Sequence, residues 1–179
     1  VVFHGHGGVV VGSEMSGGVN DLFVSNCQFL GTDVGLRFKT ARGRGGVVEN
    51  VFIQDISMKN ISGEAILFDM YYQGKDPVAT FGNGDETPKI ESKPVDAGTP
   101  QFKHIYVDRV VAKGAETGLL VRGLPEMPIH HINLSNLDIE AKQTYRVIEA
   151  TDIQISNATF KQTGDKKPEL INVKRWKLN

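Results

Sequence analysis

The sequence lacks features that would tie it to a membrane, a disulfide framework or a strongly charged partner. Its 179 residues include one cysteine, Cys27, which excludes an internal disulfide and leaves the redox compartment open. No apolar run approaches the roughly 18 residues of a membrane span, and no basic-then-apolar signal segment opens the chain. Because the net charge is −1, any preference for a charged ligand must be local. With 40% hydrophobic residues, we expect one domain over residues 1–179 with a sizeable core.

One hydrophobic pattern occurs five times along the chain. Apolar or small residues recur at offsets 0, +2, +5 and +7 from an anchor. The five anchors are Leu22, Val51, Ile105, Ile132 and Ile153. Residues two apart lie on one face of a strand, so the step of three predicts a corner. Repetition of this kind is typical of a solenoid. Cys27 occupies the +5 position of the first copy, which favours a buried apolar role over a reactive one.

A third apolar stretch follows each anchor by about 14 residues, as in Leu36–Phe38 and Ile66–Phe68. Three strands per turn predict an all-β fold, a right-handed parallel β-helix of about five to six coils, since parallel crossovers are overwhelmingly right-handed. A polar residue stands at each predicted corner. These residues are Asn26, Asp55, Arg109, Asn136 and Asn157. Because Asn and Asp tolerate left-handed backbone, we interpret these positions as corner formers and not as a metal site.

The spacing of the anchors reveals one insertion. The intervals are 29, 54, 27 and 21 residues, so the second contains a coil and an additional segment. Residues 73–100 include four Gly and four Pro and lose the periodicity. A loop of this length in a compact solenoid is usually functional or mobile, and we expect it to lie over a cleft.

Three groups in the first half of the chain could carry chemistry, and the first is His4-Gly5-His6-Gly7-Gly8. Glycines beside a histidine let the backbone turn sharply and bring the imidazole close to a ligand. A structural turn is the alternative. Neither His4 with His6 nor His130 with His131 has a convincing set of further ligands, so we expect no metal and no cofactor.

The second group is Arg37-Phe38-Lys39, followed by Arg42 and Arg44. If Phe38 points inward, strand alternation directs Arg37 and Lys39 outward together. A solvated face with neighbouring acids is one reading. A cationic cluster on a nearly neutral protein also forms a local anion site, where arginine matches a carboxylate with two donors and lysine acts as a point charge.

The third group is Asp69-Met70-Tyr71-Tyr72, where the third strand of the next coil runs into the insertion. An aromatic ring at this position can stack against a sugar or pack beneath the loop. Since the outer faces of stacked third strands are neighbours, Arg37, Lys39 and Tyr72 are predicted to line one cleft.

Taken in order, Gly5-His6-Gly7, the Gly12-Ser13-Glu14 turn, Arg37-Phe38-Lys39 and Phe68–Tyr72 resemble the C-terminal half of glycoside hydrolase family 28. The resemblance extends over roughly residues 1–125. It implies a right-handed parallel β-helix that hydrolyses α-1,4-linked galacturonic acid of pectin with inversion, and an extracellular or periplasmic location. By motif, His6 matches the histidine beside the catalytic aspartates, Arg37 and Lys39 match the cations that bind the galacturonate carboxylate, and Tyr72 matches the cleft tyrosine. Arg42 and Arg44 have no role that transfers and are candidates for further uronate units.

The family's catalytic aspartates belong to Asn-Thr-Asp and Asp-Asp motifs, and neither motif occurs in this sequence. We therefore expect the chain to be the C-terminal piece of a longer hydrolase and inactive by itself. The alternative is a non-catalytic solenoid that binds acidic polysaccharide. Either way the expected partner is a pectic galacturonan, with no membrane and no nucleic acid, because the basic cluster is short and lacks a nucleic-acid motif.

Overall fold

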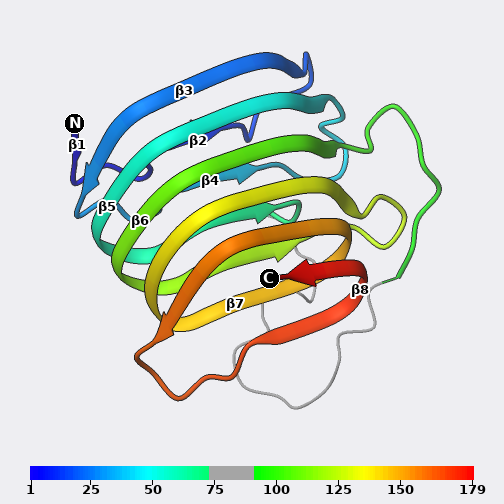
Figure 1. Cartoon of the computed structure of the whole chain (residues 1–179). Helices are drawn as coiled ribbons and strands as arrows, with labels where there is room; N and C mark the ends of the chain where they lie inside the picture. Colours follow the sequence, from blue (N-terminus) through cyan, green and yellow to red (C-terminus); the bar gives the residue numbers. More distant parts are fainter. Residues whose placement is uncertain (73–90) are drawn as a thin grey trace.

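The computed structural model describes residues 1–72 and 91–179, and its regular structure consists of parallel β-strands (Figure 1). The strands are β1 (Val2–Phe3), β2 (Val9–Val11), β3 (Val19–Leu30), β4 (Leu36–Lys39), β5 (Val47–Asp69), β6 (Gln101–Arg122), β7 (Ile129–Gln162) and β8 (Glu169–Leu178). Their order is β1-β3-β5-β6-β7-β8, and β4 pairs with both β2 and β5. The predicted fold is confirmed: the chain winds as a right-handed parallel β-helix, with coils stacked from β3 to β8.

The hydrophobic repeat sets the register between neighbouring coils. Leu22 pairs with Val51, Val51 with Ile105, and Ile105 with Ile132, so the anchors of successive copies lie directly above one another. From Val51 to Ile155 every anchor and every +2 residue is buried, as the alternation predicts. Cys27, at the first coil, is partly buried and packs against this core.

Each predicted corner is a single residue with left-handed backbone. Asn26, Asp55, Arg109, Asn136 and Asn157 have φ between 49° and 57°. We expected short strands separated by corners, yet β7 runs for 34 residues through its bends. The reason is that a single left-handed residue turns the chain at each corner. The equivalent residue in the next coil turns the chain in the same way, so pairing between the two coils continues directly after the corner. Arg109 holds its place with a bidentate ion pair to Asp55, at 2.7 and 2.9 Å.

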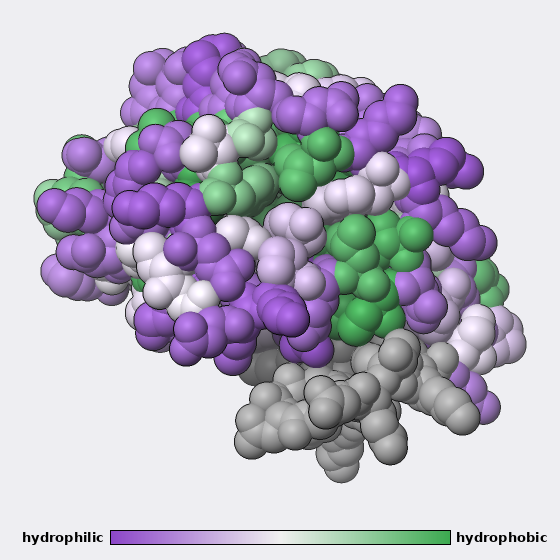
Figure 2. Space-filling view, turned by 60° about the horizontal axis from the view of Figure 1, so that its bottom comes forward, coloured by the Kyte–Doolittle hydropathy of each residue, from purple (hydrophilic) through white to green (hydrophobic). Residues whose placement is uncertain are grey.

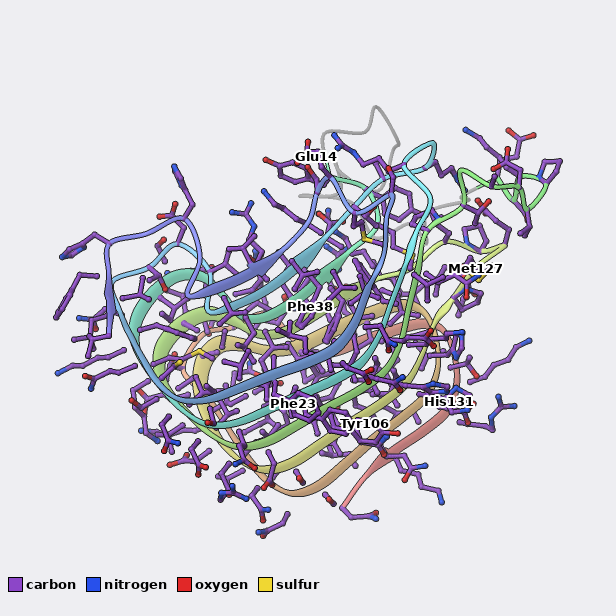
Figure 3. All side chains as sticks on the ribbon, turned by 90° about the horizontal axis from the view of Figure 1, so that it is seen from above. Glu14, Phe23, Phe38, Tyr106, Met127 and His131 are labelled. Atoms are coloured by element: carbon purple, nitrogen blue, oxygen red, sulfur yellow. The ribbon has the colours of Figure 1, made fainter. Side chains whose placement is uncertain are left out.

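Aromatic side chains fill the core beneath the third strands. The rings of Phe38 and Phe68, in adjacent coils, stack with centroids 4.7 Å apart and 12° between their planes. Phe102 meets both edge-on, at 6.2 and 6.4 Å. Viewed along the axis, Phe38 lies inside the coil (Figure 3). This packing fixes the strand β4 that carries the second candidate group.

The surface is polar over most of the side shown in Figure 2, with separate hydrophobic areas. Of the expected insertion over residues 73–100, residues 73–90 lie outside the described part of the chain. Residues 91–100 contain no strand, and the Gly98 carbonyl accepts the N–H groups of Gly43 and Gly45, which joins this segment to the turn after β4. Within the described residues, no helix is long and apolar enough to cross a bilayer.

Candidate functional site

The outer face of β4 presents the two cations that the sequence predicted together. Leu36 and Phe38 are fully buried, so alternation turns the partly exposed Arg37 and Lys39 outward. Strand β4 lies between β2 and β5: Arg37 pairs with Val10 on one side and Leu67 on the other, and Lys39 pairs with Asp69. The same coil therefore supplies a guanidinium and an ammonium to one surface.

Tyr72 joins these cations through the turn that follows β5. Its N–H donates to the carbonyl of Thr40, at 2.9 Å, which brings the chain back beside β4. The Lys39 Nζ atom lies 4.2 Å from the centre of the Tyr72 ring, and the Arg37 Cζ atom lies 5.6 Å from it. Both distances are within the range of a cation–π interaction. An aromatic ring beside two cations can stack on a sugar while they bind its acidic group.

His6 reaches the same place from the loop between β1 and β2. Its carbonyl accepts the Arg37 Nη1–H group at 3.0 Å, and its Nδ1 lies 2.6 Å from Asp33 Oδ2. The imidazole is 93% exposed. A Cβ added to Gly8 would lie 2.3 Å from the Phe29 ring, so this glycine allows the loop to pack closely on the first coil. The structure thus brings His6, Arg37, Lys39 and Tyr72 together.

An ion pair lies beside Lys39 that sequence reasoning did not identify. Arg122 Nη2 donates to Asp69 Oδ2 at 2.6 Å, and the N–H of Tyr71 donates to Asp69 Oδ1 at 2.9 Å. Glu64, on the same stretch of β5, interacts electrostatically with Arg122, Asp69 and Arg37. Burial raises the pKa of the Glu64 carboxyl above its usual range. The site therefore contains carboxyl groups as well as cations.

The two other cations of the predicted cluster have carboxylate partners. Arg42 donates from Nε and Nη2 to the two oxygens of Glu126, at 2.6 and 2.9 Å, and both side chains are largely buried. Burial opposes the charge of Glu126, but the hydrogen bond and charge of Arg42, together with hydrogen bonds from backbone N–H groups, outweigh it and hold the pKa of that carboxyl below its usual range. Arg44 lies 2.8 Å from Glu14. Both arginines therefore stabilise the turn after β4.

The partners that were missed lie one coil away from the residues they contact. Asp33 follows His6 by 27 positions and Arg122 follows Asp69 by 53, close to the anchor intervals of 29 and 54. Repeat spacing was therefore the signal that could have found them.

Three histidines gather at a corner away from this site. The ring centres of His104, His130 and His131 are 4.9 to 6.3 Å apart, and His104 and His131 both have left-handed backbone. Among residues 1–72 and 91–179, no group of three or more potential ligands is arranged to hold a metal ion. Burial lowers the pKa of His130, and the charges of His131, Lys103 and His104 lower it further, while Asp152 opposes them.

This lowered pKa predicts a loss of stability in acid. Below about pH 6.5, the ordinary histidine value, the unfolded chain binds a proton that folded His130 does not bind, so unfolding becomes more favourable as the pH falls. In His130→Gln, the fall in melting temperature between about pH 7.5 and about pH 5 should be smaller by a few degrees. Thermal melts followed by circular dichroism at the two pH values measure this. Equal falls in both proteins would contradict the assignment.

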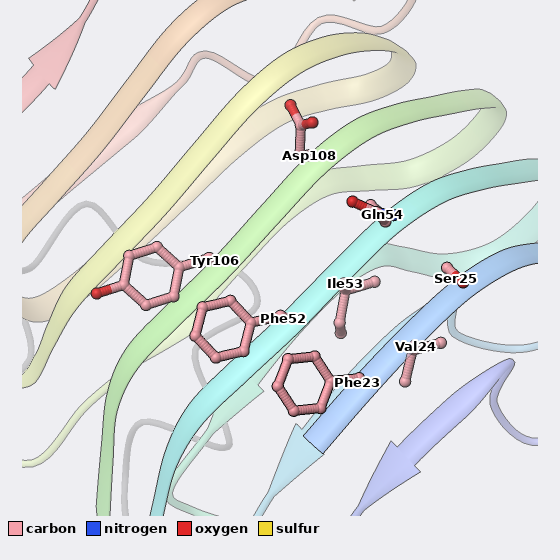
Figure 4. Close-up of a pocket in the computed structure, with 8 residues that line it drawn as sticks. All are labelled: Phe23, Val24, Ser25, Phe52, Ile53, Gln54, Tyr106 and Asp108. Carbon is pink, nitrogen blue, oxygen red and sulfur yellow. The ribbon is translucent and has the colours of Figure 1, made fainter. Parts of the chain in front are cut away.

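A hollow of about 360 Å³ lies on the outer face of β3, β5 and β6. Phe23, Phe52 and Tyr106 project from β3, β5 and β6 and stack in a row, with centroids 5.1 and 5.0 Å apart (Figure 4). Figure 3 shows Phe23 and Tyr106 toward the opposite side of the coil from Glu14, the partner of Arg44. The rings cover one another's faces, and the residues that line this hollow include none of His6, Arg37, Lys39 and Tyr72.

Comparison with known proteins connects this geometry to a family. The sequence profile of glycosyl hydrolases family 28 matches residues 1–119, which include all four residues of the candidate site. The chain belongs to glycosyl hydrolases family 28. It is 28% identical over 160 residues to an exo-poly-α-D-galacturonosidase of Dickeya chrysanthemi, covering 88% of this chain and 25% of that protein. It is 36% identical over 93 residues to a probable endopolygalacturonase B of Aspergillus niger, covering 51% of this chain and 26% of that protein.

Solved structures of exopolygalacturonases agree with the fold. The structure of a hyperthermoactive exopolygalacturonase from Thermotoga maritima superposes with a TM-score of 0.72 at 27% identity, covering 87% of this chain and 31% of that one. A family 28 exopolygalacturonase from Yersinia enterocolitica gives a TM-score of 0.73 at 19% identity, over 96% of this chain and 28% of that one. The chain thus spans about a quarter to a third of the length of these relatives and solved structures.

Proposed function

We propose that this chain forms part of a polygalacturonase-type hydrolase that cleaves the α-1,4-galacturonosidic bonds of pectin with inversion. The observation that carries the proposal is the convergence of Arg37, Lys39 and Tyr72 beside the loop of His6, whose carbonyl contacts Arg37 and whose imidazole is exposed. Membership of family 28 and the galacturonan-cleaving relatives support it. The proposed partner is a galacturonan, met in an extracellular or periplasmic location.

Each residue has a role that its chemistry suits. The Arg37 guanidinium, fixed on one side by the His6 carbonyl, binds a galacturonate carboxylate, and the Lys39 ammonium adds a point charge. The Tyr72 ring packs against the sugar. The His6 imidazole, with its Nδ1 held by Asp33, keeps the neighbouring catalytic carboxyl in the required protonation state.

Bond cleavage with inversion needs a general acid and a general base about 6.5–9.5 Å apart, so that a water molecule fits between the base and the sugar. The aspartate motifs that supply these groups in the family do not occur in the 179 residues. We therefore assign to this chain the binding of the acidic sugar and the positioning of an imidazole. The proposed unit is a single β-helix domain over residues 1–179, with the insertion at 73–100 beside the cleft.

Titration with oligogalacturonate tests the binding function. The chain should bind the acidic oligosaccharide and not a neutral galactose oligosaccharide of equal length. Binding should weaken when the salt concentration is raised to about 0.5 M, because exposed charges are then screened within a few ångströms. Equal affinity for the acidic and neutral sugars would contradict the assignment.

Turnover distinguishes the hydrolase from a binding solenoid. A family 28 protein that contains this chain together with the aspartate motifs should release reducing ends from polygalacturonate. If that longer protein binds oligogalacturonate and releases none from any pectic polymer, the non-catalytic alternative replaces the hydrolase.

A further inference from the structure

Lys39, Asp69 and Arg122 occupy matching positions in three successive coils. Lys39 pairs with Asp69, and Asp69 pairs with Arg122, so the three side chains follow one another along the same outer face. Neighbouring strands lie about 4.8 Å apart, which gives the Asp69 carboxylate a cation on each side. It bonds only one of them. Arg122 Nη2 lies 2.6 Å from Asp69 Oδ2, and the described residues contain no ion pair between Asp69 and Lys39.

The choice of partner is fixed by the surroundings of Asp69. Its side chain is 6% exposed and that of Arg122 is 19% exposed. The second carboxylate oxygen accepts the Tyr71 N–H, and the Arg122 carbonyl accepts the Met70 N–H at 3.0 Å. A carboxylate buried to this degree requires a cation, since an unpaired buried charge is costly. Arg122 fulfils that requirement, and the Lys39 ammonium lies over the Tyr72 ring.

We propose that Arg122 is a positioning residue that holds the Asp69 carboxylate away from Lys39 and so keeps the Lys39 ammonium free to bind an acidic sugar. The proposal rests on the proposed function of the His6–Tyr72 site. It assigns Arg122 no contact with the ligand. Without the guanidinium, Asp69 pairs with the cation in the preceding coil, and Lys39 is neutralised from within the protein.

Arg122→Met tests this because methionine keeps much of the apolar stem and removes the charge. Two effects are expected. Affinity for oligogalacturonate falls by about tenfold, the effect of losing one charge-assisted contact. Lys39 also reacts several-fold more slowly with an amine-reactive ester, because an ammonium held in an ion pair exposes less free amine. Peptide mass spectrometry measures that rate without any sugar present.

The double variant Asp69→Asn/Arg122→Met distinguishes an effect of the Asp69 charge on Lys39 from an effect of Arg122 on the stability of the fold. It has no carboxylate to neutralise Lys39, and the asparagine amide introduced at that position still offers an acceptor to the Tyr71 N–H. Both affinity and labelling rate should therefore return to within about twofold of the wild type. A residue that only stabilised the fold would not be rescued by removing a second charge. Arg122→Lys keeps the ion pair and should label at the wild-type rate.

The outcomes are distinct. If Arg122→Met is folded and its Lys39 labels as fast as in the wild type, the positioning role is overturned. If Arg122→Met does not fold, slower labelling in the folded double variant than in Arg122→Lys overturns it equally. If labelling slows and recovers as expected but no variant, including the wild type, binds oligogalacturonate, the proposed function fails while the contact between Asp69 and Lys39 is supported.

Discussion

Arg37→Ala and Lys39→Ala should each weaken oligogalacturonate binding by about tenfold, and in a longer, active protein should raise KM and lower kcat together. The loss of one charge-assisted contact is worth about 1.5–3 kcal/mol, and the lower end suits partly exposed side chains. Lowering kcat as well as raising KM indicates a contact that strengthens in the transition state. Isothermal titration of the chain and initial rates on polygalacturonate measure the two effects.

The chain offers a matched control for these variants. Arg44 lies in the turn after β4, but its guanidinium is already paired with Glu14. Arg44→Ala removes the same formal charge from the same region and should change affinity by less than about twofold, since exposed ion pairs contribute little. If all three variants lost affinity equally, the effect would reflect net charge, and the outward pair on β4 would have no special role.

Arg37 and Lys39 should also differ from each other in one respect. The Arg37 guanidinium donates to the His6 carbonyl, whereas Lys39 contacts the Tyr72 ring. Loss of Arg37 therefore also removes one hydrogen bond from the loop that carries the imidazole, and the fall in kcat should be greater for Arg37→Ala. The chemistry of the site thus depends on a main-chain contact that residue type alone does not reveal.

The repeat made much of this site predictable. Because side chains alternate along a strand, the burial of Phe38 requires Arg37 and Lys39 to share the outer face, and the structure has them there. The anchors also fixed which coils are neighbours. Tyr72 could be expected near β4 because the third stretches of successive coils stack, and its turn returns to Thr40.

What the sequence left open is the choice among neighbours one coil apart. The contacts of Asp69 with Arg122 and of His6 with Asp33 join different coils, and coil length changes with each insertion. A contact between coils is harder to predict across a 54-residue anchor interval than across a 27-residue one. A carboxylate between two cations pairs with the one that side-chain geometry favours. The pattern of residue types does not predict that geometry.

Phe38→Ala should cause a large loss of stability. The ring is fully buried, stacks on Phe68 at 4.7 Å and meets Phe102 edge-on. Truncation therefore removes a ring that packs against the two following coils. Such changes cost about 3–5 kcal/mol, against a total stability of about 5–15 kcal/mol for a typical domain. Urea denaturation at neutral pH measures the loss as a lower midpoint with a similar slope.

Phe23→Ala is the matched comparison, because it deletes the same atoms from a ring that also stacks on a neighbour. Phe23 is 71% exposed and lies 5.1 Å from Phe52, so its removal should cost less than about 1.5 kcal/mol. Equal losses in the two variants would mean that the coil is held together by its outer ladders as much as by its interior. A large loss confined to Phe38→Ala would show that packing in the core stabilises the strand that carries the site. Phe38 lies between Arg37 and Lys39, the two cations that the proposed function requires.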